Sequence, residues 1–159
     1  MSVRDHLLEQ CQFLRRLPPS ARAEVLACFH EEHVGFGQVV VREGDEADKF
    51  YVIVEGRLRV LRRDDDGGEC VLCVLREGDS FGEIGLLSGG ERTATVRAST
   101  EARLLSLARD DFMQMVDDSL ELREYVQSQV SRRTLQGFLR QYTGLAGIDD
   151  DVCERILQL

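Results

Sequence analysis

No stretch of the 159-residue sequence approaches the ~20 consecutive apolar residues that a membrane-spanning helix needs. Residues 1–16, MSVRDHLLEQCQFLRR, also lack the unbroken apolar core of a secretory signal, because charged residues separate the apolar ones. Basic residues are in the minority, with 20 Lys and Arg against 29 Asp and Glu and a net charge of −9. We therefore expect a cytoplasmic protein without a membrane span, which nucleic acids and anionic membranes repel on average.

Groupings of metal-binding residues are also missing. The cysteines are odd in number and irregularly spaced, at Cys11, Cys28, Cys70, Cys73 and Cys153, and the histidines (His6, His30 and His33) have no companion cluster. Cys70 and Cys73 have the CxxC spacing of zinc and redox sites, but they lie in a strand-like run, where residues three apart point to opposite faces. No second CxxC completes a zinc site, and the N-terminal cysteines are too few for an iron–sulfur cluster. We expect no metal, no disulfide and two small apolar sheet residues.

The first 30 residues have the spacing of helices. Apolar residues recur at steps of three and four, the pattern of one buried helix face, at Leu7, Leu8, Cys11, Leu14 and Leu17. Pro18 and Pro19 then break the chain, and Ser20 is expected to cap a second helix over residues 21–29. We predict an N-terminal helical segment over residues 1–30.

Between residues 31 and 108, short β-branched or apolar runs alternate with glycine- and acid-rich corners. The runs are Val39–Val41, Phe50–Val54, Leu58–Leu61, Val71–Leu75, Thr93–Ala98 and Leu104–Leu107. The corners contain Gly44, Gly56, Gly67, Gly68 and Gly78, which supply the positive φ angles of tight turns. Strands at such regular spacing favour an antiparallel roll or sandwich over a parallel sheet.

Helical spacing returns after Ala108. Asp110 is expected to cap a short helix, and a longer helix is predicted from Leu120 to about Gln141. Residues 109–143 would thus form a C-terminal helical segment. Residues 144–159 repeat the spacing of the N-terminal segment weakly, which predicts the truncated start of a second copy of the domain.

The most informative segment is FGEIGLLSGGERTATV, residues 81–96. The amides from Gly82 to Gly85 stand at the start of a short apolar helical turn, where they lack helical partners and can bind an anion. The guanidinium of Arg92 suits a phosphate, and Glu83 can accept hydrogen bonds from sugar hydroxyls. This combination matches a ribose cyclic phosphate but not a triphosphate, which would need a GxxxxGK[ST] loop. A surface ion pair between Glu83 and Arg92 is the alternative interpretation.

The string FGEIGLL…ERTATV strongly resembles the phosphate-binding cassette of the cyclic-nucleotide-binding domain family, found in protein kinase A and G regulatory domains, cyclic-nucleotide-gated channels and bacterial catabolite activators. The segment VVVREGDEADKFYVIVEGRLRVL resembles the family's earlier strands, with Gly44 and Gly56 in register. The resemblance covers residues 10–142 and is nearer to the kinase regulatory domains than to the DNA-binding activators. It implies an α+β fold: a mainly antiparallel β-roll (jelly-roll, about eight strands) over residues 31–108, flanked by N-terminal helices and a C-terminal hinge and helical lid over 109–143.

The resemblance also implies the ligand, cAMP or cGMP, and the residues that hold it. Glu83 would bind the ribose 2′-hydroxyl, Arg92 the exocyclic phosphate oxygens, and the amides of Gly85 and Thr93 would complete the phosphate cradle. The expected ligand-binding set is Gly82, Glu83, Ile84, Gly85, Leu86, Arg92, Thr93 and Ala94. In the family, a Thr directly after this Arg is associated with cGMP, because its hydroxyl can reach the guanine 2-amino group, but some members with this Thr prefer cAMP. A Thr that merely suits a strand is equally compatible, so the base stays open.

A regulatory sensor, not an enzyme, is the function that the resemblance implies. Ligand would draw the cassette inward, and the C-terminal helix would close over the base and relay binding to an attached or partner effector domain. Candidate lid residues on one apolar stripe are Leu135, Phe138, Leu139 and Tyr142, and the alternative role for that stripe is packing on the roll.

The residues also bear on three other functions: a DNA-binding activator, an enzyme and a module that binds no nucleotide. A DNA-binding activator needs a helix-turn-helix after the long helix, and residues 143–159 are rich in Asp and poor in basic residues, so we expect no nucleic-acid partner. An enzyme needs converging catalytic groups, and no nucleophile–base or acid pair is evident. The main alternative is a degenerate copy that binds no nucleotide and serves as a structural or interaction module; the intact Glu83 and Arg92 argue against it.

Overall fold

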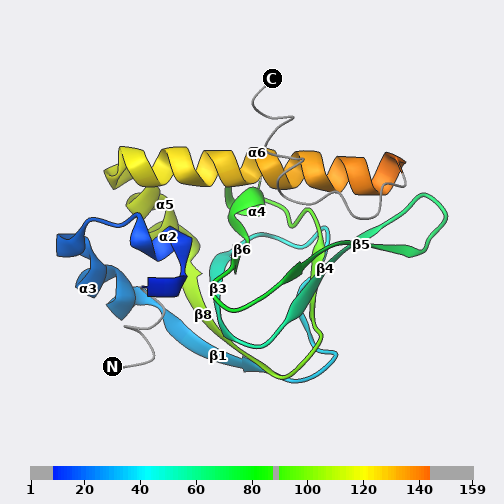
Figure 1. Cartoon of the computed structure of the whole chain (residues 1–159), viewed down its shortest axis with the longest axis horizontal. Helices are drawn as coiled ribbons and strands as arrows, with labels where there is room; N and C mark the ends of the chain where they lie inside the picture. The colour runs from blue at the N-terminus through cyan, green and yellow to red at the C-terminus, as the bar shows by residue number, and fades with distance from the viewer. Residues whose placement is uncertain (1–8, 88–89, 144–159) are drawn as a thin grey trace.

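The computed structural model describes residues 9–87 and 90–143, except for the side chains of Gln136 and residues 138–143 (Figure 1). The elements in chain order are α2 (Gln12–Arg15), α3 (Pro19–Cys28), β1 (His30–Val34), β2 (Val39–Val41), β3 (Lys49–Glu55), β4 (Leu58–Arg63), β5 (Glu69–Leu75), β6 (Ser80–Phe81), α4 (Glu83–Leu87), β7 (Thr95–Ala98), β8 (Ala102–Ala108), α5 (Arg109–Asp118) and α6 (Leu120–Thr143). Residues 144–159, predicted to begin a second copy of the domain, lie outside the described part of the chain.

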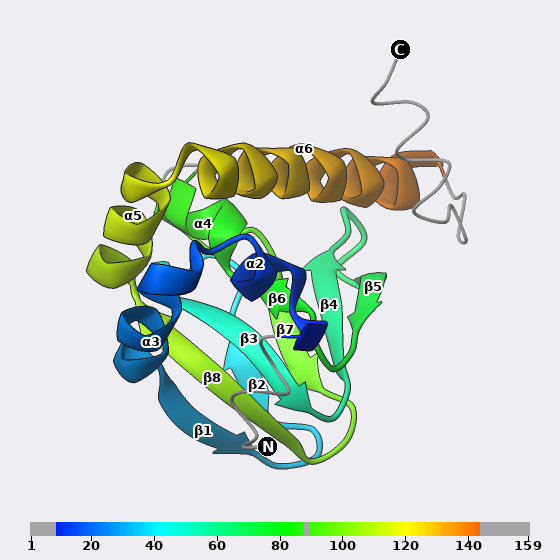
Figure 2. The same cartoon turned by 60° about the vertical axis from the view of Figure 1, so that its left-hand side comes forward.

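The eight strands form two four-stranded sheets in the orders β1-β8-β3-β6 and β2-β7-β4-β5, and every strand pairing is antiparallel. Figure 2 shows the strands folded into a roll, with α2, α3 and α5 gathered at one end and α6 lying along one side. The predicted α+β fold with an antiparallel roll is therefore confirmed.

Strand β3 lies between two hydrophobic cores, one among the helices and one inside the roll. Its sequence, KFYVIVE, is buried on both faces because successive side chains of a strand point to opposite sides. Phe50 and Val52 pack with the helices, in the cluster that also holds Phe13 and Phe112. Tyr51 and its neighbour Ile53 face the interior of the roll, packing with Phe81, Val96 and Leu104. A single strand thus separates a helical core from a roll core, which fixes α5 and α6 against the sheet.

The first part of α6 is attached firmly to this helical core. Leu122 and Val126 are fully buried there, and Val130 packs partly against it. These residues recur at steps of four, so they form one apolar face of the helix. Their burial positions the following turns of α6, from about Arg133 onward, over α4 and the open side of the roll (Figure 1).

Helix starts differ from the sequence predictions at two positions. Helix α3 begins at Pro19 with Pro18 at the N-cap, so Ser20 is not the cap; the fixed φ of a proline suits the first helical turn, where no amide donor is needed. Helix α5 begins at Arg109 with Ala108 at the N-cap. Asp110 instead occupies the first turn, where a carboxylate is favourable beside the positive end of the helix dipole.

The N-terminal apolar pattern predicted burial correctly but not a continuous helix. Cys11, Leu14 and Leu17 are buried, yet the backbone is extended at Cys11, the N-cap position of α2 (φ −84°, ψ 114°). Leu7 and Leu8 lie outside the described residues.

Two strands were missed and one was predicted too long. The polar sequence HEEHV gave no apolar signal for β1, and β6 has only two residues. Strand β7 begins at Thr95, so Thr93 and Ala94 precede the strand. In β5, the register against β4 shifts at Leu72, a β-bulge that breaks the expected alternation of faces. Within the described residues, no helix is long and apolar enough to cross a membrane.

Candidate functional site

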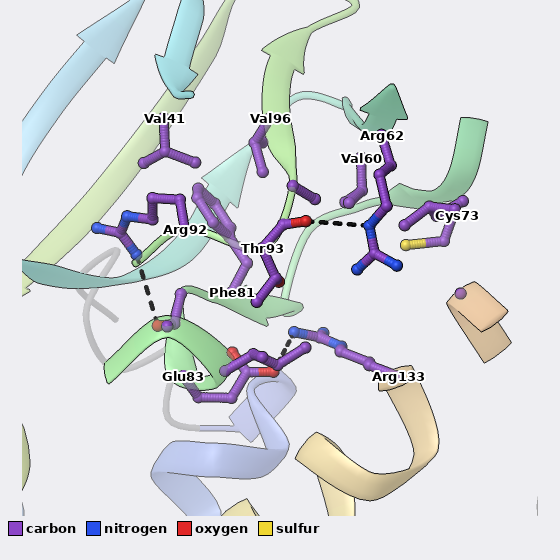
Figure 3. Close-up of a pocket in the computed structure, with 16 residues that line it drawn as sticks. Val41, Val60, Arg62, Cys73, Phe81, Glu83, Arg92, Thr93, Val96 and Arg133 are labelled. Atoms are coloured by element: carbon purple, nitrogen blue, oxygen red, sulfur yellow. Dashed lines mark hydrogen bonds and ion pairs between the residues drawn. The ribbon is translucent and has the colours of Figure 1, made fainter. Parts of the chain in front are cut away.

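The cavity with the most functional side chains lies where the open side of the roll meets α4 and α6 (Figure 3). It is lined by Val41, Val60, Arg62, Leu72, Cys73, Phe81, Gly82, Glu83, Ile84, Gly85, Arg92, Thr93, Ala94, Val96, Arg133 and Gly137. Strands supply mainly apolar side chains, α4 supplies backbone and one carboxylate, and α6 supplies Arg133 and Gly137. One wall is therefore polar and built from the segment 82–94, and the rest is mostly apolar.

Two glycines shape the polar wall because no side chain fits at their positions. Gly82 has φ +100°, and a Cβ there would lie 2.8 Å from the carbonyl oxygen of Lys49 and 2.9 Å from Arg92 Nη1. A Cβ on Gly85 would lie 2.8 Å from both the Ala47 Cβ and the Glu91 carbonyl oxygen. The backbone of α4 is thereby held close to β3 and to the Glu91–Arg92 segment, which brings its first amides to the cavity.

Arg92 is a buried cation held in place by the end of β3. Its side chain is 4% exposed, and its Nη2 donates to the Lys49 carbonyl at 2.9 Å and to Asp48 Oδ1 at 3.3 Å. Its Nη1 donates to the Gly82 carbonyl at 3.5 Å (Figure 3). These bonds hold the guanidinium beside the first turn of α4, so a fixed positive charge and the backbone of that turn border the same cavity.

Glu83 is the buried carboxylate of the site. It is 2% exposed, and its Oε1 accepts a hydrogen bond from Arg133 Nη1 at 2.5 Å. Its other oxygen, Oε2, is buried and has no partner within the described part of the molecule. Because buried polar atoms are almost always hydrogen-bonded, this oxygen is an acceptor that lacks the expected donor.

Arg133 reaches the cavity from α6, opposite the strands, and ties the helix to α4 through Glu83 (Figure 3). Burial lowers the pKa of Arg133, but the adjacent Glu83 carboxylate, with smaller contributions from Cys73 and Asp79, raises it overall above its usual value. The guanidinium of Arg133 is therefore permanently charged.

A third guanidinium, that of Arg62 on β4, lies at the other end of the cavity. Its Nε donates to the Thr93 carbonyl at 3.0 Å, and Glu43 Oε1 lies 4.0 Å from the same nitrogen. Close by, a Cβ on Gly137 would lie 3.4 Å from Leu72 Cδ1 and 3.7 Å from Arg62 Nη1. Helix α6 thus presents bare backbone to this end of the cavity.

The charges of the lining residues give the cavity a sign opposite to that of the whole chain. Three guanidinium groups face one carboxylate, an excess of two positive charges in a protein of net charge −9. The lining of the cavity therefore suits an anion better than a cation.

The cavity is small in the described conformation. Its volume is about 70 Å³, whereas small-molecule sites usually measure roughly 300–1,000 Å³. A ligand of nucleotide size therefore requires the walls to separate. Helix α6, which contributes Arg133 and Gly137, forms one of these walls.

The structure brings together seven of the eight residues predicted to bind ligand. These are Gly82, Glu83, Ile84, Gly85, Arg92, Thr93 and Ala94. Leu86 is the exception: it is 3% exposed and belongs to the helical core, because its position in the short helix α4 directs it toward the protein interior. The alternative of a surface pair between Glu83 and Arg92 is wrong, since each is buried and has other partners.

The predicted lid residues all lie on α6, and the described residues of this helix that line the cavity are Arg133 and Gly137. Arg133 and Gly137 are four residues apart and share one face. Leu135 lies about half a turn away and is half-buried, outside the lining set of described residues. The side chains of Phe138, Leu139 and Tyr142 lie outside the described part of the structure.

Sequence reasoning missed Arg62, Cys73, Arg133 and Gly137. A glycine inside a predicted helix was the one available signal, because it costs about 1 kcal/mol relative to alanine and needs a local reason. Cys73, expected among the apolar residues of the sheet, packs against the roll core and also borders the cavity, directly after the bulge in β5. Of the cysteines that the structure describes, none forms a disulfide, and no group of three metal-binding side chains occurs there.

Comparison with known proteins gives the site a context. Residues 31–119 match the profile of a family described as "Cyclic nucleotide-binding domain". A CRP-like cAMP-activated global transcriptional regulator of Mycobacterium tuberculosis is 30% identical over 129 residues, 81% of this chain and 58% of that protein. The cGMP-dependent protein kinase 2 of Mus musculus is 27% identical over 150 residues, 94% of this chain and 18% of the kinase.

Among solved structures, the regulatory subunit of a cAMP-independent protein kinase A from Trypanosoma brucei superposes with a TM-score of 0.73 at 25% identity. The match covers 79% of this chain and 46% of that subunit. The chain thus spans about half the length of the bacterial regulator and of the kinase subunit, and less than a fifth of the mouse kinase.

Proposed function

Because the chain belongs to the cyclic nucleotide-binding domain family, we propose that the cavity beneath α6 binds a cyclic nucleotide monophosphate and that α6 relays this binding to an effector. The observation that carries the proposal is the buried Oε2 of Glu83, an acceptor without a partner among the described residues, in a cavity with three guanidinium groups. A ribose hydroxyl supplies the missing donor, and a phosphate supplies the negative charge that the arginines attract.

Each chemical part of the ligand has a matching part of the cavity. The ribose 2′-hydroxyl donates to Glu83, and the exocyclic phosphate oxygens accept from Arg92 and from the amides of Gly85 and Thr93. The base then lies along the apolar strand wall, toward Val60 and Leu72. Arg92 keeps its contacts to β3, so it holds the phosphate against a fixed part of the roll.

Both cAMP and cGMP are candidates. The printed names of the relatives include a cAMP-activated regulator, a cGMP-dependent kinase and a cAMP-independent kinase subunit, so kinship supports no single base. Thr93 lines the cavity, where its hydroxyl could meet the 2-amino group of guanine.

The relay follows from the contact between α6 and α4. In the described conformation Arg133 of α6 bonds to Glu83, and the cavity is too small for a nucleotide. Ligand entry therefore repositions α6 relative to the roll, a shift between two arrangements that ligand favours differently. The effector is an attached or partner domain, and we propose neither catalysis nor nucleic-acid binding by the chain itself.

The proposal is tested by isothermal titration of the nucleotide-stripped protein with cAMP and cGMP separately, using the parent chain and Arg92→Ala. We expect micromolar or tighter binding of at least one nucleotide, weakened ~10- to 100-fold in the variant, because each charge-assisted hydrogen bond contributes about 1.5–3 kcal/mol. Asp48→Asn is the matched control: it removes an exposed partner of Arg92, and we expect less than a threefold change.

Two outcomes would contradict the proposal. If neither nucleotide bound, the chain would be a degenerate member of the family that serves as a structural or interaction module. If Arg92→Ala bound as tightly as the parent while remaining folded, the phosphate would lie elsewhere.

A further inference from the structure

The guanidinium of Arg62 lines the end of the cavity away from α4 (Figure 3). Arg62 is on β4, and its side chain is 25% exposed, so it is neither a core residue nor a fully solvated one. Its neighbour Arg63 and the nearby Arg59 on the same strand are exposed instead. Figure 3 shows the Arg62 side chain directed from the strand toward the space between Thr93, Cys73 and Arg133.

The position of Arg62 is coupled to the residues expected to hold the phosphate. Its Nε donates to the Thr93 carbonyl at 3.0 Å, and Thr93 directly follows Arg92. Glu43 Oε1, 4.0 Å from Nε, compensates part of the charge. The guanidinium is thus attached to the phosphate-binding segment and has a defined place relative to the ligand.

The same end of the cavity is where the base of a bound nucleotide must lie. With the ribose at Glu83 and the phosphate at Arg92, the wall around Arg62 includes Val60, Leu72 and Cys73 from the strands and Gly137 from α6. Gly137 has no side chain with which to recognise a base. Arg62 is the strand-borne cation of this wall, and its bond from Nε to the Thr93 carbonyl places its guanidinium there.

We propose that Arg62 reads the base and favours a 6-oxopurine, so that the chain binds cGMP more tightly than cAMP; this inference rests on the proposed function. A guanidinium has five donors and no acceptor. Guanine presents two adjacent acceptors, O6 and N7, which match such a fork, whereas adenine presents a donor, the 6-amino group, beside N7. Burying a donor against a donor leaves both unpaired and costs affinity for adenine.

A contribution of Arg62 to base selectivity can be distinguished from one of Thr93. Thr93 can distinguish guanine only through the 2-amino group, whereas Arg62 would read the O6 and N7 edge. Inosine 3′,5′-cyclic monophosphate (cIMP) has that edge but lacks the 2-amino group. Recognition by Arg62 therefore predicts that cIMP binds like cGMP, and recognition by Thr93 alone predicts that cIMP binds like cAMP.

The experiment is equilibrium titration of the nucleotide-stripped chain with cAMP, cGMP and cIMP. We expect cGMP and cIMP to bind roughly 10- to 100-fold more tightly than cAMP, the range of one bidentate arginine contact. In Arg62→Ala, this preference should fall to within about threefold, while the Kd for cAMP changes little. Arg59→Ala, an exposed arginine of the same strand, is the matched control and should keep the preference.

Three results would overturn the inference. One is cAMP binding as tightly as cIMP in the parent. A second is an equal loss of affinity for all three nucleotides in Arg62→Ala, which would mean that the guanidinium stacks on any purine without reading it. A third is an unchanged preference in that variant. Binding of none of the three nucleotides would instead contradict the proposed function, which separates the two failures; thermal unfolding of each variant confirms that it is folded.

Discussion

At the scale of the residue, Glu83 is a buried carboxylate with only one of its two oxygens hydrogen-bonded among the described residues. A carboxylate that is 2% exposed loses most of its hydration, and its interaction with Arg133 satisfies one oxygen only. A fully satisfied pair would have been more favourable for the empty protein. The remaining acceptor is therefore best explained by a ligand hydroxyl that completes it.

The partner of Glu83 should matter for stability even without ligand. We expect Arg133→Ala to lower the free energy of unfolding by on the order of 2–3 kcal/mol, below the usual cost of breaking a fully buried pair because Arg133 keeps some contact with water. Arg123→Ala, which removes an exposed ion pair between α6 and Asp117 of α5, should cost less than about 1 kcal/mol. Urea unfolding followed by circular dichroism measures both, and equal effects of the two variants would contradict the assignment.

The buried thiol of Cys11 should make the free energy of unfolding depend on pH. Burial raises the pKa of its thiol from 9.0 to about 11, despite hydrogen bonds to the backbone that lower it. The unfolded chain therefore loses this proton first as the pH rises, so the contribution of Cys11 to stability is complete below pH 9 and declines between pH 9 and about 11.

We expect Cys11→Ala to reduce that decline, by on the order of 1–3 kcal/mol across the window. Urea unfolding at pH 8, 9 and 10 compares the variant with the parent over the range in which Tyr51, whose pKa burial raises to about 12, contributes little. Identical pH slopes for the two proteins would show that the Cys11 thiol does not set this dependence.

At the scale of the element, the turn that leads into α4 positions both Arg92 and the first amides of the helix. Gly82→Ala would add a Cβ 2.8 Å from the Lys49 carbonyl oxygen and 2.9 Å from Arg92 Nη1, at a φ of +100°. We expect it to lower both stability and nucleotide affinity, the latter about 10-fold or more because Arg92 must move.

Gly67→Ala is a control for the backbone strain alone. Gly67 has φ +82°, but a Cβ there would meet nothing within 4 Å, and the residue lies in the turn between β4 and β5. We expect a loss of stability of about 1 kcal/mol and unchanged affinity. If both variants bound nucleotide equally well in titration, close packing at Gly82 would not be what places Arg92.

Some strands could be predicted from the sequence and others could not. The strands β3 and β4 were predictable because their apolar and β-branched runs end at corners that contain glycine. Strand β1 was not, because its polar side chains give no pattern and its pairing with β8 holds it in place. The two-residue β6 is too short for any periodicity.

The cassette was predictable for a different reason: its residues are consecutive, so Glu83, Gly85 and Arg92 are brought together by one local turn. Arg62 and Arg133 reach the same cavity only because β4 and α6 are placed there by the distant packing of the roll and of Leu122 and Val126. The apolar stripe around Leu135 gave no sign that the orientation of α6 turns Arg133 and Gly137 toward the cavity. Which face of a helix a site uses depends on tertiary contacts that one sequence does not display.

For the whole molecule, the central claim is that a cyclic nucleotide enters between the roll and α6 and changes the relation between them. The first turns of α6 are fixed by the helical core, whereas Arg133 and Gly137 border the cavity. Opening the cavity from about 70 Å³ to nucleotide size must therefore affect the second half of α6 more than its first half.

Hydrogen–deuterium exchange with and without saturating nucleotide tests this claim most directly. The account predicts slower exchange in residues 82–96 and an altered rate in α6 from about Arg133 onward, with little change in β1, which contributes no residue to the cavity lining. Unchanged exchange in both the cassette and the second half of α6, under conditions where titration shows the site to be full, would contradict it.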